Sequence, residues 1–318
     1  MPRSTILVSL LAATSTAYAD QRFTLDAPAP EDGSHKAIIG GSEVQPGQWP
    51  DAVAVLGTNG TCTGTLIAPD VVLTAGHCAG IDPVQVIANT TDYAGDAGVR
   101  AHVANTTAYP SWQTSYDVAV LVLASPIASV TPRKVGTSCT FDTFTRETPV
   151  RLVGFGATDM TGVAANTQLL QAMTAVTDPE CVGGNGCKKA IAPGGEFVAG
   201  GTGNADSCFG DSGGPVYLDT PSGTVVIGAV SRGVDGSDTP CGGGGIYVRT
   251  DKLIDWIEAT TGKVIEKDAC EGVAYSGEDV PEGVDGEEVG CAATRGSGAG
   301  AFGAVAIALV ALVRRRRR

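Results

Sequence analysis

The chain has 318 residues, a formal net charge of −13 at pH 7 and 43% hydrophobic residues. A surface this acidic repels phosphates, which argues against nucleic acid as a partner. The hydrophobic content suffices for a packed core, while 44 glycines, 17 prolines and only 5% aromatic residues favour short strands and many turns over long helices.

The first 37 residues are predicted to precede the folded region. Residues 1–19 carry one Arg, an apolar stretch over 6–13 and the sequence Ala-Tyr-Ala at 17–19, which is the layout of a Sec-type signal peptide. The apolar stretch is too short to span a bilayer. Residues 20–37 are polar and contain proline, so we expect a short disordered leader. Export would place the nine cysteines in an oxidising compartment, where most should be paired.

Short β-type runs follow, separated by clusters of Gly, Pro, Asn and Asp. They cover residues 52–56, 65–67, 71–73, 84–87, 118–123, 150–153, 225–230 and 246–248. This pattern predicts an antiparallel barrel or sandwich. One helix is expected in "TDKLIDWIEATTG", with Leu253, Ile254 and Ile257 on one face and Gly262 past its end. The folded domain is therefore expected to span 38–268.

The C-terminal part is predicted to be a spacer and a hydrophobic segment. Residues 269–291 form an acidic flexible spacer, since 270–291 carry seven acids and no basic residue. Within 292–318, residues 296–313 are uncharged and five arginines end the sequence. As a helix this stretch would be about 27 Å long, which barely spans a bilayer, with the arginines on the cytoplasmic side.

Three short motifs carry candidate chemistry. "LTAGHC" contains His77, "YDVAVLVL" contains Asp117 and "GDSGGP" contains Ser212. Taken singly, each has a structural explanation, such as a hydrogen-bonded histidine or a turn aspartate. Together they provide a nucleophile, its base and an orienting carboxylate. The backbone N–H groups of Gly210 and Ser212 would stabilise the oxyanion.

These motifs, with "IIGGSEVQPGQWP" at 38 and "GIYVRT" at 245, make residues 38 to about 260 resemble the trypsin-like serine proteases of the chymotrypsin fold. The resemblance implies an all-β domain of two antiparallel six-stranded barrels with a C-terminal helix, and no cofactor. It also implies His77 as general base, Asp117 as its orienting carboxylate and Ser212 as nucleophile, with Ser231 supporting Asp117.

The resemblance also implies a specificity pocket, with Asp206 at its floor. A buried carboxylate without a cation costs about 3–5 kcal/mol, so Asp206 predicts cleavage after Arg or Lys. The alternative for Asp206 is a surface turn. The other substrate-binding residues implied are Ser207, Ser231, Gly233 and Gly245. Arg232 replaces the usual tryptophan of the wall that binds upstream substrate residues, and its effect on specificity is left open.

In the family, activation frees a new N-terminus, here Ile38, whose ammonium pairs with the acid before the nucleophile, here Asp211. The leader, residues 20–37, would then be an activation propeptide, and an intact leader would mean an inactive zymogen. Ala37 precedes Ile38 where an Arg or Lys is usual. We therefore expect a separate activating protease.

The resemblance implies disulfides Cys62–Cys78 and Cys208–Cys241, with Cys187 as a replacement partner for Cys181. A metal site in "CVGGNGC" is the weaker alternative, because no further ligand lies nearby, and no metal is expected. The tail resembles myxobacterial-type C-terminal sorting signals, which would consume Cys291 and leave Cys139 to pair with Cys270. A single-pass anchor is the alternative for the tail.

The sequence thus predicts a secreted or surface-anchored serine endopeptidase, extracellular or on a bacterial cell surface, acting on proteins or peptides with Arg or Lys at the cleavage site. Two alternatives remain. One is a catalytically silent homologue that binds peptides or proteins, and the other is a protease selective for small or apolar residues.

Overall fold

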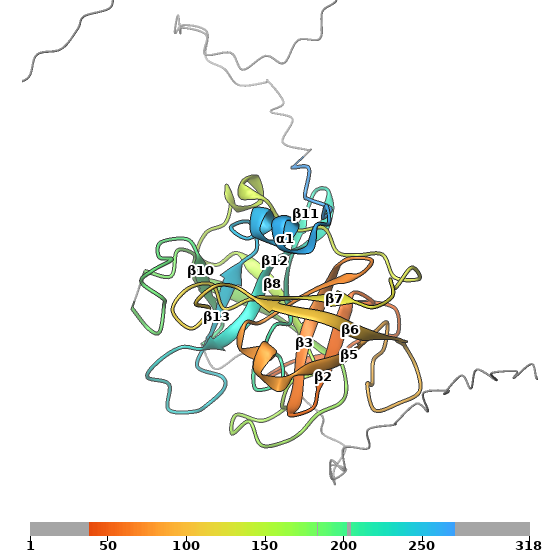
Figure 1. The fold of residues 1–318 in the computed structure, drawn as a ribbon. Coiled ribbons are helices and arrows are strands. Elements are labelled where there is room, and N and C mark those ends of the chain that lie inside the picture. Colours follow the sequence, from red (N-terminus) through yellow and green to blue (C-terminus); the bar gives the residue numbers. More distant parts are fainter. Residues whose placement is uncertain (1–37, 183, 202–204, 271–318) are drawn as a thin grey trace, which may run out of the picture. The chain divides into compact units, whose positions relative to one another are not determined.

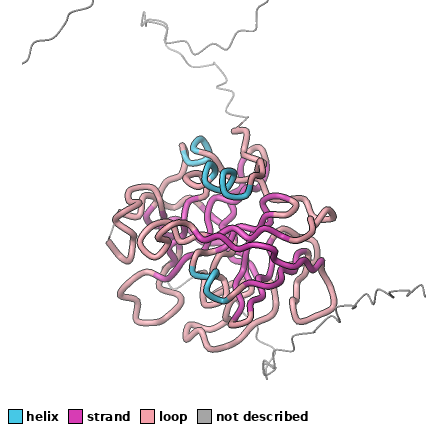
Figure 2. Tube along the Cα trace, viewed as in Figure 1, coloured by secondary structure: helices cyan, strands magenta, loops and turns pink. Residues whose placement is uncertain are grey.

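The computed structural model describes residues 38–182, 184–201 and 205–270, and short strands dominate them (Figures 1 and 2). The predicted signal peptide, leader and C-terminal segment, and all of the spacer except Ala269 and Cys270, lie outside the described residues. In the part of the chain that is described, no helix is long and apolar enough to cross a membrane.

The first barrel is closed and antiparallel, with strand order β2-β3-β4-β7-β6-β5. Its strands are β2 (Ala52–Gly57), β3 (Gly60–Ala68), β4 (Val71–Thr74), β5 (Pro83–Ala88), β6 (Val99–Ala108) and β7 (Ala119–Leu123). Valines and leucines of β2, β3, β4 and β7 fill its interior, among them Val53, Leu66 and Leu121. Closure leaves no unpaired edge in the barrel.

The second barrel has the order β9-β10-β13-β12-β11-β8 and closes because β8 also pairs with β9. Its strands are β8 (Pro149–Gly154), β9 (Leu170–Asp178), β10 (Glu196–Ala199), β11 (Pro215–Thr220), β12 (Gly223–Gly233) and β13 (Gly245–Arg249), and the short β1 (Ser42–Glu43) adds to β9. The predicted architecture of two six-stranded antiparallel barrels is confirmed.

A buried charged network joins the two barrels. Asp51, which precedes β2 and is 0% exposed, accepts hydrogen bonds from the Arg133 guanidinium at 2.5 and 2.9 Å and from the Tyr217 hydroxyl of β11 at 2.6 Å. The Arg133 guanidinium lies over the Tyr217 ring, 4.9 Å from its centroid. The charge of Asp51 is therefore compensated by Arg133. The contacts of Asp51 with Arg133 and Tyr217 link the two barrels without leaving an unpaired buried ion.

The expected helix is present as α1 (Ile254–Thr261). Leu253 and Ile257 are buried, and Gly262 ends the helix with a left-handed backbone (φ 67°) that glycine adopts without steric cost. Two short 3-10 helices, η1 (His77–Ile81) and η2 (Ser138–Phe141), complete the regular structure of the residues that the model describes.

Five strands were not predicted from the sequence: β1, β6, β9, β10 and β11. β6 is mostly half-buried or exposed, and only Ala101 in it is buried. Its sequence "VRAHVANTTA" therefore lacks the apolar run that identified the other strands. β10 has only four residues, too few for a periodicity to be read.

Candidate active site

His77 and Asp117 are brought together by the pairing of two first-barrel strands. β4 ends at Thr74, which lies opposite Ala119 at the start of β7. His77 follows β4 by three residues and Asp117 precedes β7 by two, so both lie at the same end of this strand pair.

The Asp117 carboxylate accepts hydrogen bonds from three directions. The His77 backbone N–H donates to Oδ1 at 2.9 Å, His77 Nδ1 lies 2.9 Å from Oδ2, and the Ser231 hydroxyl donates to Oδ2 at 2.7 Å. Burial alone would raise the pKa of Asp117, but the bonds from His77 and Ser231 outweigh it and hold that pKa below its ordinary value. Asp117 is therefore ionised at neutral pH. Since a carboxylate only accepts, Nδ1 carries the ring proton and Nε2 of the neutral ring is free to take one.

Ser212 lies in the segment that precedes β11, residues 205–214, which we call the Ser212 loop. The direction of its backbone N–H groups is set by hydrogen bonds to neighbouring carbonyls. The Phe209 carbonyl accepts a hydrogen bond from the Ala157 N–H at 2.7 Å. Because the peptide is planar and trans, the Gly210 N–H points away from Ala157. Gly210 has φ +97°, a conformation that favours glycine. Among the described residues, neither the Gly210 nor the Ser212 N–H has a hydrogen-bond acceptor. The prediction that these two groups bind an oxyanion requires both to be available.

Ser212 lies in the same neighbourhood as His77. Its backbone carbonyl accepts from the Thr63 N–H at 2.9 Å and lies 3.6 Å from the Cys78 sulfur, next to His77. Within the described part of the chain, no hydrogen bond joins the Ser212 hydroxyl to His77. Such contacts are often long in a free enzyme and shorten when substrate binds.

Asp206 is buried at 1% exposure. Its carboxylate accepts from the N–H groups of Ser207, Gly242 and Gly244 at 2.8, 2.9 and 2.9 Å. Burial raises the pKa of Asp206, and these three N–H donors oppose that rise. No cationic side chain of the described residues pairs with it.

The predicted wall glycines lie opposite each other, since Gly233 of β12 pairs with Gly245 of β13. A Cβ on Gly245 would clash with the Tyr247 hydroxyl and come within 2.9 Å of the Ser207 hydroxyl. Position 245 therefore has no room for a side chain beside Tyr247 and Ser207.

The family model described as Trypsin matches residues 38–257. The chain belongs to the trypsin family. It is 30% identical to a trypsin of Saccharopolyspora erythraea over 233 residues, which is 69% of this chain and 95% of that protein. It is 29% identical to human serine protease 56 over 255 residues and 28% identical to human transmembrane protease serine 5 over 242 residues. These matches cover 71% and 70% of this chain but only 39% and 51% of the two human proteins.

The two residues predicted to pair on activation, Ile38 and Asp211, are both buried in this trypsin-family chain. Ile38 is 0% and Asp211 1% exposed. Ile39 pairs with Asp206, so the segment beginning at Ile38 lies beside the loop that carries Asp211. The Asp211 carboxylate accepts from the Gly156 and Cys208 N–H groups at 2.8 and 2.9 Å. Burial raises the pKa of Asp211 to about 7, against the effect of these two donors.

The charge of Arg232 is matched by an acid that the sequence did not reveal. Glu196 of β10, whose side chain is 1% exposed, receives two hydrogen bonds from the Arg232 guanidinium at 2.7 and 3.0 Å. The same guanidinium donates to the Gly186 carbonyl and to the Ser231 hydroxyl. Arg232 is thus held by its partners and linked, through Ser231, to Asp117.

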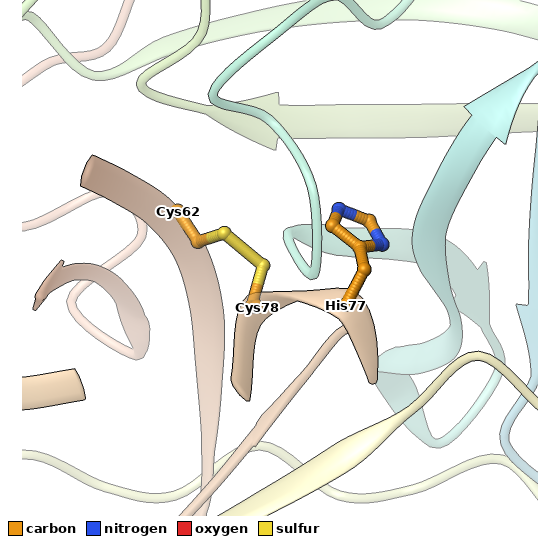
Figure 3. Close-up of side chains that lie close together, drawn as sticks. All are labelled: Cys62, His77 and Cys78. Atoms are coloured by element: carbon orange, nitrogen blue, oxygen red, sulfur yellow. A yellow bond between two sulfur atoms is a disulfide. The ribbon is translucent and has the colours of Figure 1, made fainter. Parts of the chain in front are cut away.

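The described cysteines form four disulfides: Cys62–Cys78, Cys139–Cys270, Cys181–Cys187 and Cys208–Cys241. Cys291, the predicted sorting residue, lies outside the described residues. Cys62, His77 and Cys78 lie close enough together to form a potential metal-binding group. In Figure 3, however, the two sulfur atoms are bonded to each other and the His77 ring is turned to the other side. With no free thiolate, this cluster lacks the ligands that zinc requires.

Two further residues near the site were missed at the sequence level. The Trp112 ring lies 6.2 Å from the His77 ring, between centroids. Lys188 donates from Nζ to the Trp112 carbonyl at 2.5 Å. Neither residue belongs to a recognised motif. Only the tertiary contacts identify them.

Proposed function

We propose that this protein is a serine endopeptidase that hydrolyses peptide bonds after Arg or Lys. The observation that carries the proposal is the buried Asp206 carboxylate, which is bonded to three backbone N–H groups but has no cation among the described residues. A substrate guanidinium or ammonium would supply the missing countercharge, and an apolar side chain would leave it unpaired. Asp206 lies six residues before Ser212 in the same loop region.

The reaction uses the groups described above. His77 Nε2 takes the proton of Ser212 Oγ as that oxygen attacks the substrate carbonyl carbon. The negative charge that develops on the carbonyl oxygen is stabilised by the N–H groups of Gly210 and Ser212. His77 then gives the proton to the leaving amine, and water hydrolyses the acyl-enzyme by the same route. Asp117 holds the ring orientation and stabilises the imidazolium.

The protein is made as a zymogen in this proposal. The nitrogen of Ile38 is an uncharged peptide nitrogen while Ala37 is attached, and a cut between these two residues would create an ammonium to pair with Asp211. An enzyme that cuts after Arg or Lys would not cut after Ala37, so a separate protease performs the cut. Sequencing the N-terminus of active material tests this, since a start anywhere but Ile38 contradicts it.

Export and surface attachment belong to the same proposal and rest on sequence outside the described residues. Residues 1–19 would direct Sec-dependent export, and residues 292–318 would attach the protein to a membrane or cell surface, through a sorting signal at Cys291 or as an anchor. Fractionating cells that produce the full chain and a chain ending at residue 291 compares the two directly. Equal release of both forms would contradict attachment by the tail.

The decisive experiment measures amide hydrolysis after Arg, Lys, Phe and Ala. In the full chain, the recognition sequence of a cysteine protease replaces residues 33–37. That protease cuts just before Ile38, which becomes the first residue, and is inactivated before the assay. Ser212→Ala should abolish turnover. Asp206→Ser should lower kcat/KM for Arg substrates at least about 100-fold, consistent with about 3 kcal/mol for a desolvated ion pair. Asp235→Ser, which removes an exposed acid, is the matched control and should change little.

Three outcomes separate the candidate functions. Cleavage after Arg or Lys that depends on Ser212 and Asp206 supports the proposal. Turnover only after Phe or Ala would contradict the pocket assignment while keeping the nucleophile. A folded protein with a free Ile38 that neither turns over substrate nor labels with a fluorophosphonate would favour the silent peptide-binding homologue.

A further inference from the structure

Thr63, on β3 of the first barrel, contacts the Ser212 loop at two points. Its side chain is fully buried, its hydroxyl donates to the Gly210 carbonyl at 2.8 Å, and its backbone N–H donates to the Ser212 carbonyl at 2.9 Å. The same hydroxyl accepts from the Phe155 N–H at 3.2 Å. Thr63 therefore bonds the carbonyls of both residues whose N–H groups would bind the oxyanion.

Gly210 needs such restraints because glycine has the largest backbone freedom to lose. The peptide before Gly210 is held by the Ala157 N–H on the Phe209 carbonyl, and the peptide after it by the Thr63 hydroxyl on the Gly210 carbonyl. With both flanking peptide planes held, the direction of the Gly210 N–H is defined. Among the described residues, Thr63 supplies the one side-chain hydrogen bond to that carbonyl.

The hydroxyl of Thr63 is itself oriented. By accepting from the Phe155 N–H, which follows β8 of the second barrel, it is left to donate its single proton to Gly210. The Thr63 backbone carbonyl also accepts from the Thr74 hydroxyl at 2.8 Å, which fixes the strand at this residue. The first barrel, which carries His77 and Asp117, is thus hydrogen-bonded to the loop that carries the oxyanion donors.

We propose that Thr63 is a positioning residue that aligns the Gly210 and Ser212 N–H groups with the transition-state oxyanion. This inference rests on the proposed function, since it concerns the same reaction. It assigns a role in the chemical step to a buried threonine that touches neither the substrate nor the reacting atoms. Loss of its hydroxyl would leave the Gly210 carbonyl and the Phe155 N–H without their partner.

The same strand provides a matched control two residues away. Thr65 is also buried, at 1% exposure, and its hydroxyl has no hydrogen-bond partner in the described structure. Thr65→Val and Thr63→Val make the same chemical change, on the same strand, in a buried setting. Only the second removes a contact to the Ser212 loop.

The test compares Thr63→Val, Thr63→Ser and Thr65→Val in the activated full chain. Removing an oxyanion donor outright costs about 10²–10³ in kcat, so misaligning one should lower kcat about tenfold. KM for an Arg amide should change less than about twofold, since Asp206 is untouched. Thr63→Ser keeps the hydroxyl and should retain kcat, and Thr65→Val should match the parent. If Thr63→Val does not fold, Thr63→Ala gives the same comparison.

A pair of inhibitors provides a readout that a merely structural role would not change. An arginine aldehyde adds to Ser212 Oγ, so its former carbonyl oxygen occupies the oxyanion position, whereas benzamidine binds only as a cation beside Asp206. Thr63→Val should weaken the aldehyde about tenfold and leave benzamidine unchanged. Equal weakening of both inhibitors, an unchanged kcat in Thr63→Val, or a kcat in Thr63→Ser as low as in Thr63→Val would overturn the inference. An inactive parent would instead contradict the proposed function.

Discussion

Replacing Asp211 by Asn should change how the stability of the uncut chain depends on pH. The carboxyl is 1% exposed and burial raises its pKa from 3.8 to about 7. At about 1.36 kcal/mol per pKa unit, this difference corresponds to about 4 kcal/mol. Because the folded-state pKa is raised, the folded state keeps a proton that the unfolded state has lost between about pH 4 and pH 7. Ionisation of Asp211 therefore lowers the free energy of unfolding of the uncut chain as the pH rises through that window. Above about pH 7 this contribution no longer changes with pH.

The amide side chain that Asp211→Asn introduces carries no charge at any pH. Its amide has one acceptor oxygen, so it loses one of the two N–H bonds from Gly156 and Cys208, which costs about 1 kcal/mol. The variant should be about 0.5 kcal/mol less stable than the parent at pH 4, where the unfolded carboxyl is already partly ionised, and about 3 kcal/mol more stable at pH 8, by the arithmetic of linkage.

Urea unfolding of the uncut full chain at several pH values, followed by tryptophan fluorescence, measures these differences. Both proteins carry Ser212→Ala to prevent self-cleavage. If the difference in free energy of unfolding between variant and parent stays constant within about 1 kcal/mol from pH 4 to pH 8, the reasoning is refuted. Cutting the parent before Ile38 should itself remove the slope, because the new ammonium would pair with Asp211 and lower its pKa.

Two further predictions concern residues around the site. Glu196→Gln leaves the Arg232 charge unmatched, so kcat/KM should fall for substrates with upstream Arg or Lys and hold for those with Glu. The free energy of unfolding should also fall by about 1–3 kcal/mol, less than for a fully buried pair since the Arg232 side chain is 27% exposed. Glu180→Gln, which changes a half-exposed acid, is the control, and an equal loss in both variants would contradict the role of the pair. Replacing both Cys139 and Cys270 by Ser opens a loop with a sequence separation of 131, whereas replacing both Cys181 and Cys187 opens one with a separation of 6. Chain entropy predicts that the free energy of unfolding falls by about 5 kcal/mol in the first variant and about 2 kcal/mol in the second. Chemical denaturation can rank the two, and the reverse order would exclude loop closure as the main cause.

Much of the fold and the candidate chemistry could be predicted from the sequence. Continuous apolar runs located the interior strands of both barrels, including β2, β4 and β12, because a strand buried against a core needs apolar residues at neighbouring positions. The helix α1 was found from its buried face and its terminal glycine. The motifs around His77, Asp117 and Ser212 named side chains whose types and order fit acyl transfer, and the structure joins the first two by a hydrogen bond.

What the sequence could not provide are the contacts between residues far apart in the chain. Thr63 and Gly210 are 147 positions apart, and Arg232 and Glu196 are 36 apart. Neither pair has a local pattern, because each depends on how strands of one or two barrels align. The half-exposed strand β6 was missed for a related reason: it pairs with β5 on one edge and β7 on the other, and these pairings leave no apolar run in its own sequence. Local sequence determined which chemical groups this protein has. The closure of the barrels decided which of those groups meet, since strand register sets the partners of every side chain.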